Sequence, residues 1–132
     1  MKHAALIARL CEASEGSAEL SREVWEALTG DEYRINSTWF HVERVRLVEA
    51  DGGGQFVERM RAPCLTTSLS AAWEEAEMRG HRVINVELCA YAAPHYTVIL
   101  DDLKTRQRRM MIGSQTGALA ICAAILAAEG ER

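Results

Sequence analysis

Apolar residues recur at helical spacing in residues 2–14 and 17–30, which predicts two short helices joined by a turn. Ser17 can cap the second helix with its hydroxyl group, and Gly30 can end that helix in a left-handed conformation. The stretch that follows, residues 31–38, is polar and rich in turn-forming residues. It is expected to be a loop that changes the direction of the chain.

From residue 39 the pattern changes to apolar residues that alternate with charged ones, which is typical of a β-strand. The alternation breaks at Asp51, where three glycines follow, and it resumes over residues 55–61. Glycines supply the positive φ angles that tight hairpin turns need. The pattern therefore predicts a β-hairpin, which Pro63 ends.

Helical spacing returns after the hairpin, where the hydroxyls of residues 66–68 can cap a third helix that ends at Gly80. Strands are then expected at residues 83–91, 96–100 and 107–112, with a turn over residues 92–95. These strands predict an antiparallel meander. The chain as a whole predicts one α+β domain over residues 1–132, since this length suits a single hydrophobic core.

The last predicted helix, residues 117–128, is capped by Thr116 and carries no charge before Glu129. A helix that is apolar almost all round is normally covered on most sides. Two explanations stay open at this point. The helix lies in the core of the domain, or part of it meets another subunit.

Composition and charge exclude several classes of protein. No apolar run approaches the ~20 residues that cross a bilayer, and the N-terminus lacks a signal-peptide core, so a cytoplasmic protein is expected. A formal net charge of −4 argues against general nucleic-acid binding. The four cysteines lie too far apart in sequence for a paired zinc-ligand motif and are expected to be reduced, buried thiols.

No motif in the sequence predicts catalysis. The four histidines occur without a nucleophile motif such as G-x-S-x-G. The three consecutive glycines lack the lysine and helix of a phosphate-binding loop, so a hairpin turn explains them better. The acidic residues fall on a helix surface and a strand end, where solvated carboxylates are routine. We therefore predict no catalytic residue, no metal site and no cofactor.

The arginines of the predicted hairpin are its most informative polar residues. If the loop has two or four residues, Arg44 lies opposite Arg61 and Arg46 lies opposite Arg59. Four guanidinium groups would then share one face, where like charges destabilise the hairpin unless an anion such as phosphate neutralises them. The alternative is that these arginines are solvated or salt-bridged. A loop of three or five residues would separate them.

A second basic cluster, in the turn and strand before the last helix, consists of Lys104, Arg106, Arg108 and Arg109. Helix N-termini favour anions through free amide donors and the helix dipole. A phosphate held between this turn and Thr116 is one interpretation. The other is a solvated charge run on an edge strand that discourages aggregation.

Three stretches of the chain carry a resemblance to a known family. They are APCLTTSLSAA at residues 62–72, LSREVWEAL at residues 20–28 and TGALAICAA at residues 116–124. These stretches look like the phage ABA sandwich domain, a group of short phage and prophage proteins. The likeness extends over most of the chain outside the hairpin, which resembles an insertion, and Gly117 stands where that pattern is expected to have proline.

The resemblance implies a three-layer α/β/α sandwich with a mainly antiparallel sheet and an inserted β-hairpin, in a phage-encoded accessory protein of a host bacterial cell. Some phage proteins of similar size are sponges, oligomers that bind cyclic nucleotide or cyclic ADP-ribose signals of bacterial immune systems such as Thoeris and CBASS. Together with the arginines, this favours a non-enzymatic homo-oligomer that sequesters an anionic nucleotide-type ligand.

The residues predicted to contact this ligand are Trp39, Arg44, Arg46, Arg59, Arg61, Arg106, Arg108, Arg109 and Thr116. Two other functions stay open. One is a module that binds a host or phage protein through its helix faces, and the other is a small nucleotide-processing enzyme.

Overall fold

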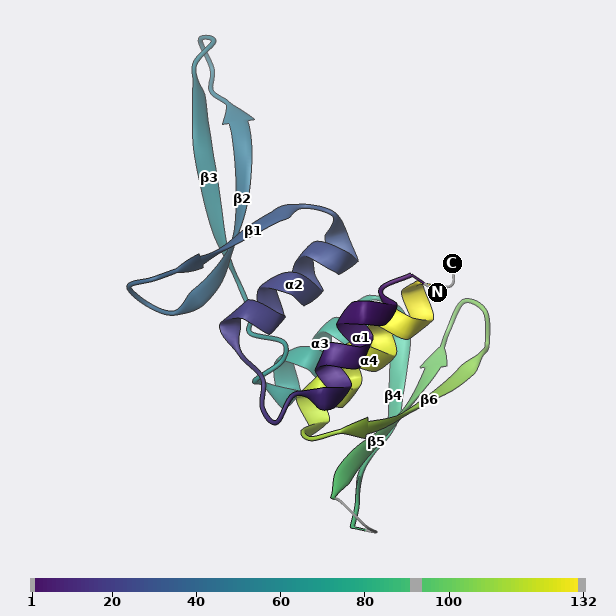
Figure 1. Cartoon of the computed structure of the whole chain (residues 1–132). Helices are drawn as coiled ribbons and strands as arrows, with labels where there is room; N and C mark the ends of the chain where they lie inside the picture. Colours follow the sequence, from purple (N-terminus) through teal and green to yellow (C-terminus); the bar gives the residue numbers. More distant parts are fainter. Residues whose placement is uncertain (1, 91–93, 131–132) are drawn as a thin grey trace.

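The computed structural model describes residues 2–90 and 94–130, which form four helices and two antiparallel sheets of three strands each (Figure 1). The helices are α1 (Ala4–Glu12), α2 (Ala18–Thr29), α3 (Leu69–Met78) and α4 (Gly117–Glu129). The first sheet contains β1 (Glu32–Asn36), β2 (His41–Glu49) and β3 (Gln55–Ala62), in that order. The second contains β4 (His81–Cys89), β5 (His95–Asp102) and β6 (Arg108–Ser114), also in sequence order. The predicted α+β class and the predicted β-hairpin are confirmed.

Helix α4 forms the centre of the domain. Ten of its 13 residues are buried, and it contacts α1, α2 and α3 as well as all three strands of the second sheet. This arrangement explains why the sequence of α4 carries no charge before Glu129, since no side of the helix faces water. The core explanation of this helix is confirmed, because a single chain already covers it.

The helices lie between the two sheets. In Figure 1, α1, α4 and α3 pack against the second sheet, and α2 lies between these helices and the first sheet. Val98 and Leu100 of β5 are buried on the helix side of the second sheet, whereas the neighbouring Ile99 is only partly covered. The predicted meander is confirmed for the described residues. Residues 92 and 93 of the predicted turn lie outside them.

The loop predicted over residues 31–38 is wrong for most of its length. Residues 32–36 form β1, which pairs with β2 from Glu32↔Val45 to Asn36↔His41. Tyr33 is the residue that secures this strand, because its ring stacks on Trp25 of α2 with ring centroids 5.8 Å apart. A five-residue strand with charged residues on its exposed side has too few apolar positions to be distinguished from a loop by its pattern alone.

Three helices begin at the hydroxyl caps that their sequences offer. Ser17, Ser68 and Thr116 each accept a hydrogen bond from the backbone N–H three residues later, which satisfies one of the first-turn donors. The predicted caps Ser17 and Thr116 are confirmed. Gly30 ends α2 with a φ of 77°, the left-handed conformation expected of it.

Two buried hydroxyls join α2 to the segment before α3. Ser21 Oγ lies 2.7 Å from Thr66 Oγ1, and the Thr66 backbone N–H donates to Ser21 Oγ at 3.1 Å. Thr66 Oγ1 also donates to the Ser17 carbonyl oxygen at 2.9 Å. Gly16 lies against the Thr66 carbonyl so closely that a Cβ atom there would overlap it.

Candidate functional site

The loop of the β2–β3 hairpin decides where its arginines lie. The strands pair from Val42↔Ala62 to Glu49↔Gln55, so five residues, Ala50–Gly54, form the loop. Gly52 and Gly53 take φ angles of 99° and 89°, and the Ala50 backbone N–H donates to the Gly54 carbonyl oxygen at 2.7 Å. An odd loop length shifts the pairing by one residue compared with the predicted two- or four-residue loop.

The predicted face of four arginines is therefore wrong. Arg44 lies opposite Met60 and Arg46 opposite Glu58, whereas Arg59 lies opposite Val45 and Arg61 opposite Glu43. Paired side chains share a face and successive ones alternate. The first two arginines thus lie on one face of the hairpin, and the other two lie on the opposite face. Because the four guanidinium groups do not share a face, repulsion between them gives no reason to expect a bound anion.

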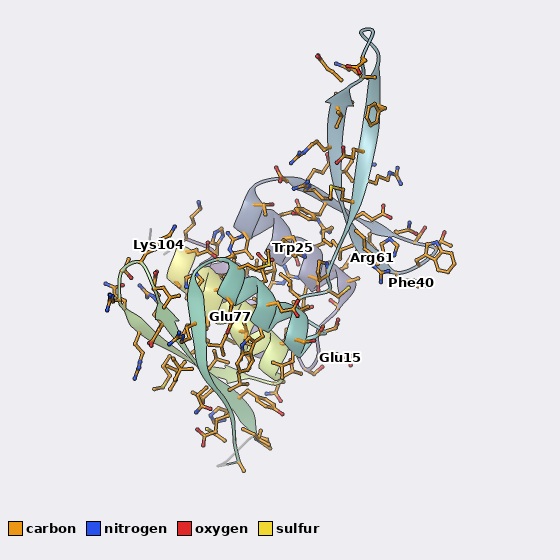
Figure 2. All side chains as sticks on the ribbon, turned by 180° about the vertical axis from the view of Figure 1, so that it is seen from behind. Glu15, Trp25, Phe40, Arg61, Glu77 and Lys104 are labelled. Atoms are coloured by element: carbon orange, nitrogen blue, oxygen red, sulfur yellow. The ribbon has the colours of Figure 1, made fainter. Side chains whose placement is uncertain are left out.

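The structure does bring Arg44 and Arg61 to one small cleft at the base of the hairpin. This cleft of about 180 Å³ lies beside the stacked rings of Trp25 and Tyr33 (Figure 2). Arg44 Nη2 donates to Met60 Sδ at 3.4 Å, and its Nη1 lies 3.9 Å from Asp31 Oδ2. Both aromatic residues are almost fully buried, so the cleft offers little aromatic surface on which a base could stack.

Glu43 lies on the face of the hairpin opposite to Arg44, and hydrogen bonds from β1 and β2 hold its carboxylate in place. Its Oε1 accepts a hydrogen bond from Asn36 Nδ2 at 3.0 Å and lies 2.8 Å from His41 Nε2. The hydrogen bonds from Asn36 and His41 lower the pKa of Glu43. The carboxylate of Glu43 therefore already has hydrogen-bond partners within the first sheet, although Arg61 lies opposite it on β3.

Trp39 lies in the turn between β1 and β2, next to Phe40, and both side chains are about three-quarters exposed, at 73% and 75%. Asn36 Oδ1 accepts the backbone N–H groups of Thr38 and Trp39 and so fixes this turn. The turn precedes β2, whereas the hairpin loop follows it. Trp39 and the hairpin tip therefore lie at opposite ends of this strand.

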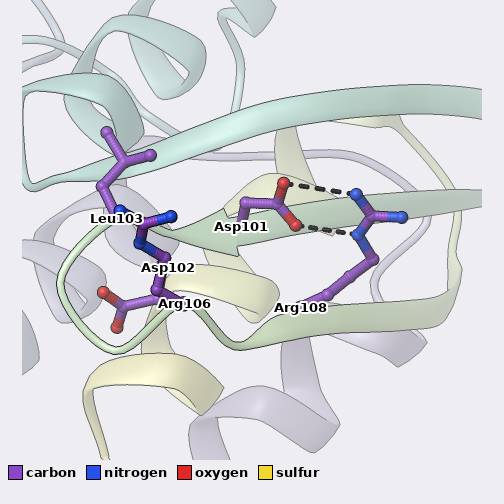
Figure 3. A pocket seen from close by; sticks show the side chains of 5 residues that line it. All are labelled: Asp101, Asp102, Leu103, Arg106 and Arg108. Carbon is purple, nitrogen blue, oxygen red and sulfur yellow. Dashed lines mark hydrogen bonds and ion pairs between the residues drawn. The ribbon is translucent and has the colours of Figure 1, made fainter.

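The second basic cluster borders a cleft of about 550 Å³ at the β5–β6 turn (Figure 3). Arg108 donates to both carboxylate oxygens of Asp101, from Nε at 2.8 Å and from Nη2 at 3.3 Å. This pairing lowers the pKa of Asp101 and raises that of Arg108. Asp102, buried beside it, accepts the backbone N–H groups of Lys104 and Thr105. The cleft is thus lined by carboxylates as well as by Arg106 and Arg108.

Thr116 lies far from this turn, at the other end of β6. The seven residues of that strand span about 20 Å. A phosphate held between the β5–β6 turn and Thr116 is therefore excluded. Arg109 bonds Gln107 Oε1 at 3.2 Å within the same strand region, and the β6 strand is the edge of its sheet, as the alternative interpretation of this cluster supposed.

Thr116 instead borders a cleft at the beginning of α3 and α4. Its volume is about 310 Å³, and its lining comes from the segments before α2 and α3 and from the first residues of α3 and α4: Glu15, Gly16, Thr66, Thr67, Leu69, Thr116, Gly117 and Ala118. First-turn N–H groups of a helix have no intrahelical acceptor. The cleft therefore combines two positive helix ends with hydroxyl groups, beside one carboxylate.

Groups able to perform catalysis are sparse in the part of the chain that the structure describes. It contains no set of three or more His, Cys, Asp or Glu residues arranged to hold a metal ion. The four cysteines are unpaired, and burial raises the pKa of the Cys122 thiol to about 12. Cys122 is fully buried in the core, Cys11 and Cys64 are partly buried against it, and Cys89 is partly buried in β4, so the expectation of buried core thiols is met in full by Cys122 and in part by Cys11 and Cys64. No helix of this part is long and apolar enough to cross a bilayer.

The most distinctive surface of the molecule, which the sequence pattern did not indicate, is the arm, defined as residues 45–59 of the β2–β3 hairpin. The arm projects away from the helices (Figure 1), and among the described helices and strands β3 contacts only β2. Leu47 and Val57 pair on one face and are 64% and 54% exposed. Val48 and Phe56 pair on the other face. These pairs depend on the five-residue loop, because with a loop of two or four residues Leu47 would lie opposite Glu58.

Comparisons with known proteins give no further information on the site. No family model, no curated protein and no solved structure matches the chain. The resemblance to the phage ABA sandwich domain stays a prediction, and so does the nucleotide-binding function that it implies.

Proposed function

We propose that this chain is a non-enzymatic binding protein whose arm docks on another protein surface. The observation that carries the proposal is the exposure of large apolar side chains on both faces of a two-stranded projection. Contiguous exposed apolar surface is rare on soluble domains without a partner. An isolated hairpin is also marginally stable in water, so a covering surface would stabilise the arm.

This proposal changes the predicted way of binding. Helix faces were expected to meet the partner, but the apolar face of α4 is used up inside the domain. The arm combines apolar cross-strand pairs near its tip, arginines nearby and the free edge of β3. An exposed edge strand can accept a further strand from a partner.

Photo-crosslinking in cells that produce the protein tests this function. A photoreactive phenylalanine analogue replaces Phe56 at the arm, and in a matched control it replaces Leu103, an equally exposed apolar residue of the β5–β6 turn. We expect a covalent adduct of defined mass from the Phe56 position and none from the Leu103 position. Absence of an adduct from Phe56, or the same adducts from both positions, would rule out the arm as the binding element.

A second candidate function is the binding of a phosphate-bearing anion in the cleft at the N-termini of α3 and α4. Two helix ends beside Thr67 and Thr116 favour it, because positive helix dipoles and free amides bind anions. The sequestration of a cyclic nucleotide or cyclic ADP-ribose, which the family resemblance implies, would use this cleft rather than the arginines of the arm.

Thermal unfolding with inorganic phosphate and a panel of cyclic nucleotides tests this candidate. Thr67→Asp places a negative charge at the exposed mouth of the cleft, and Ser37→Asp places the same charge in the distant β1–β2 turn as a control. We expect ligand to raise the melting temperature of the parent and of Ser37→Asp but not of Thr67→Asp. A parent protein that responds to no member of the panel would eliminate this candidate.

A further inference from the structure

The two faces of the arm differ in charge as well as in apolar side chains. On the face that carries Val48 and Phe56, Arg46 lies opposite Glu58. On the face that carries Leu47 and Val57, Arg59 lies opposite Val45. Arg59 is exposed, and its charge helps to lower the pKa of Glu43 on the same face, although the two groups are not in ion-pair contact. This face therefore presents an apolar pair between the positive charge of Arg59 and, towards the tip, the negative charge of Glu49.

A surface of complementary character lies on α3. Leu69, Ser70, Trp73 and Glu74 line an open, mainly apolar groove of about 340 Å³. Leu69 is 45% exposed at the beginning of the helix, and Trp73 lies one turn further on. The Glu74 carboxylate borders the groove, and Glu77 follows it, held by a hydrogen bond from Trp73 Nε1 at 3.0 Å. The groove thus presents apolar side chains followed by negative charge.

The arm of a chain does not reach its own groove. In Figures 1 and 2 the arm extends away from the helices, and its tip lies far from α3 in both views. The first sheet meets the helices through α2 alone among the described elements. An arm that fills this groove must therefore come from another molecule.

We infer that the partner of the arm is a second copy of this chain, with Leu47 and Val57 of each copy packed in the α3 groove of the other and Arg59 facing Glu74. This inference rests on the proposed binding function of the arm. In a dimer with a two-fold axis, each chain places its arm in the groove of the other. The same contact then occurs twice, and no arm or groove remains free to bind a third chain. A stable interface needs about 800 Å² from each partner, and in this dimer each chain contributes two elements to it, one arm and one groove.

Sedimentation equilibrium of the purified chain tests the inference. We expect a dimer, with twice the 14.7 kDa mass of one chain. Leu47→Ser combined with Val57→Ser is expected to give monomer, whereas Leu103→Ser, which changes an equally exposed apolar residue elsewhere, is expected to keep the dimer. Circular dichroism of each variant checks that the fold is retained. A parent protein that is monomeric at all concentrations would overturn the inference.

A charge exchange tests the pairing itself. Arg59→Glu and Glu74→Arg each place like charges at both contacts of a homodimer, so each variant alone is expected to dissociate much more readily than the parent. In a mixture of the two variants, every contact again joins one positive and one negative residue. We therefore expect the mixture to form a heterodimer, and failure of the mixture to associate would contradict the pairing of Arg59 with Glu74.

The outcomes separate this inference from the function on which it rests. A purified chain that stays monomeric, together with a Phe56 adduct of another mass in cells, would refute the second copy as partner and retain the arm as a binding element. A monomer that gives no adduct would refute both.

Discussion

Arg59 lies directly opposite Val45 in the β2–β3 ladder, so its guanidinium group and that of Arg46 lie on opposite faces of the arm. Pairing with an apolar residue leaves Arg59 without the cross-strand carboxylate that Arg46 has in Glu58. The same one-residue shift pairs Leu47 with Val57 on one face and Val48 with Phe56 on the other, so each face has its own apolar pair. The arm therefore carries a different set of side chains on each face rather than a cluster of four arginines.

The arm residues are expected to contribute little to the stability of the single chain. Leu47→Ser with Val57→Ser removes side chains that water already reaches, so the free energy of unfolding in dilute protein should change by less than about 1 kcal/mol. Leu119→Ala in the buried centre of α4 should cost about 2–5 kcal/mol. Urea denaturation followed by circular dichroism measures both, and comparable losses would show that the arm belongs to the core.

Gly16 is expected to be one of the least replaceable positions outside the helices. In Gly16→Ala the new Cβ would overlap the Thr66 carbonyl and displace the hydroxyl contacts among Ser17, Ser21 and Thr66. We expect a loss of about 1–3 kcal/mol in the free energy of unfolding. Gly54→Ala, where a Cβ meets open space, is the matched control and should be nearly neutral. Equal effects of the two substitutions would contradict the close approach at Thr66.

Glu129 is expected to make stability depend on pH in acid. Burial raises the pKa of this carboxyl, but His81 and Arg79 outweigh burial and bring the pKa down to about 2. Arg79 donates to both Glu129 oxygens, at 2.6 and 2.8 Å. Because the folded pKa lies below the ordinary value of 4.5, the stabilisation is complete above about pH 5 and is lost as the pH falls towards 2.

Chemical denaturation between pH 2 and pH 7 measures this effect, which amounts to at most about 3 kcal/mol. Glu129→Gln should flatten the pH dependence, whereas Glu74→Gln, at an exposed carboxylate, should leave it unchanged. A pH dependence that Glu129→Gln does not alter would contradict the assigned role of the Arg79–Glu129 pair.

The helices could be predicted because their signals are local. Ser17 and Thr116 are caps that act on the next three residues, and Gly30 ends a helix through its own backbone conformation. The burial of α4 followed from its lack of charge. Such features need no knowledge of distant contacts, so the periodic pattern and the capping residues were sufficient for them.

The positions of the candidate site residues depend on the length of the hairpin loop and on contacts between distant residues, which the pattern of apolar and polar positions does not determine. Three consecutive glycines permit loops of several lengths, and a change of one residue moves Arg59 from one face of the hairpin to the other. The stacking of Tyr33 on Trp25 makes β1 a strand, although its own residues are mostly polar. Thr116 is separated from the β5–β6 turn by the length of β6, Arg108–Ser114, so the two cannot share one phosphate.

Amide hydrogen exchange of the arm at several protein concentrations tests the account most directly. A hairpin that is covered only in an assembly is expected to be protected only when the assembly forms. We therefore predict that the amides of residues 46–49 and 55–58 exchange slowly in concentrated protein and rapidly after dilution, while those of α4 remain protected throughout. Exchange in the arm that is independent of protein concentration would contradict docking of the arm on a second copy.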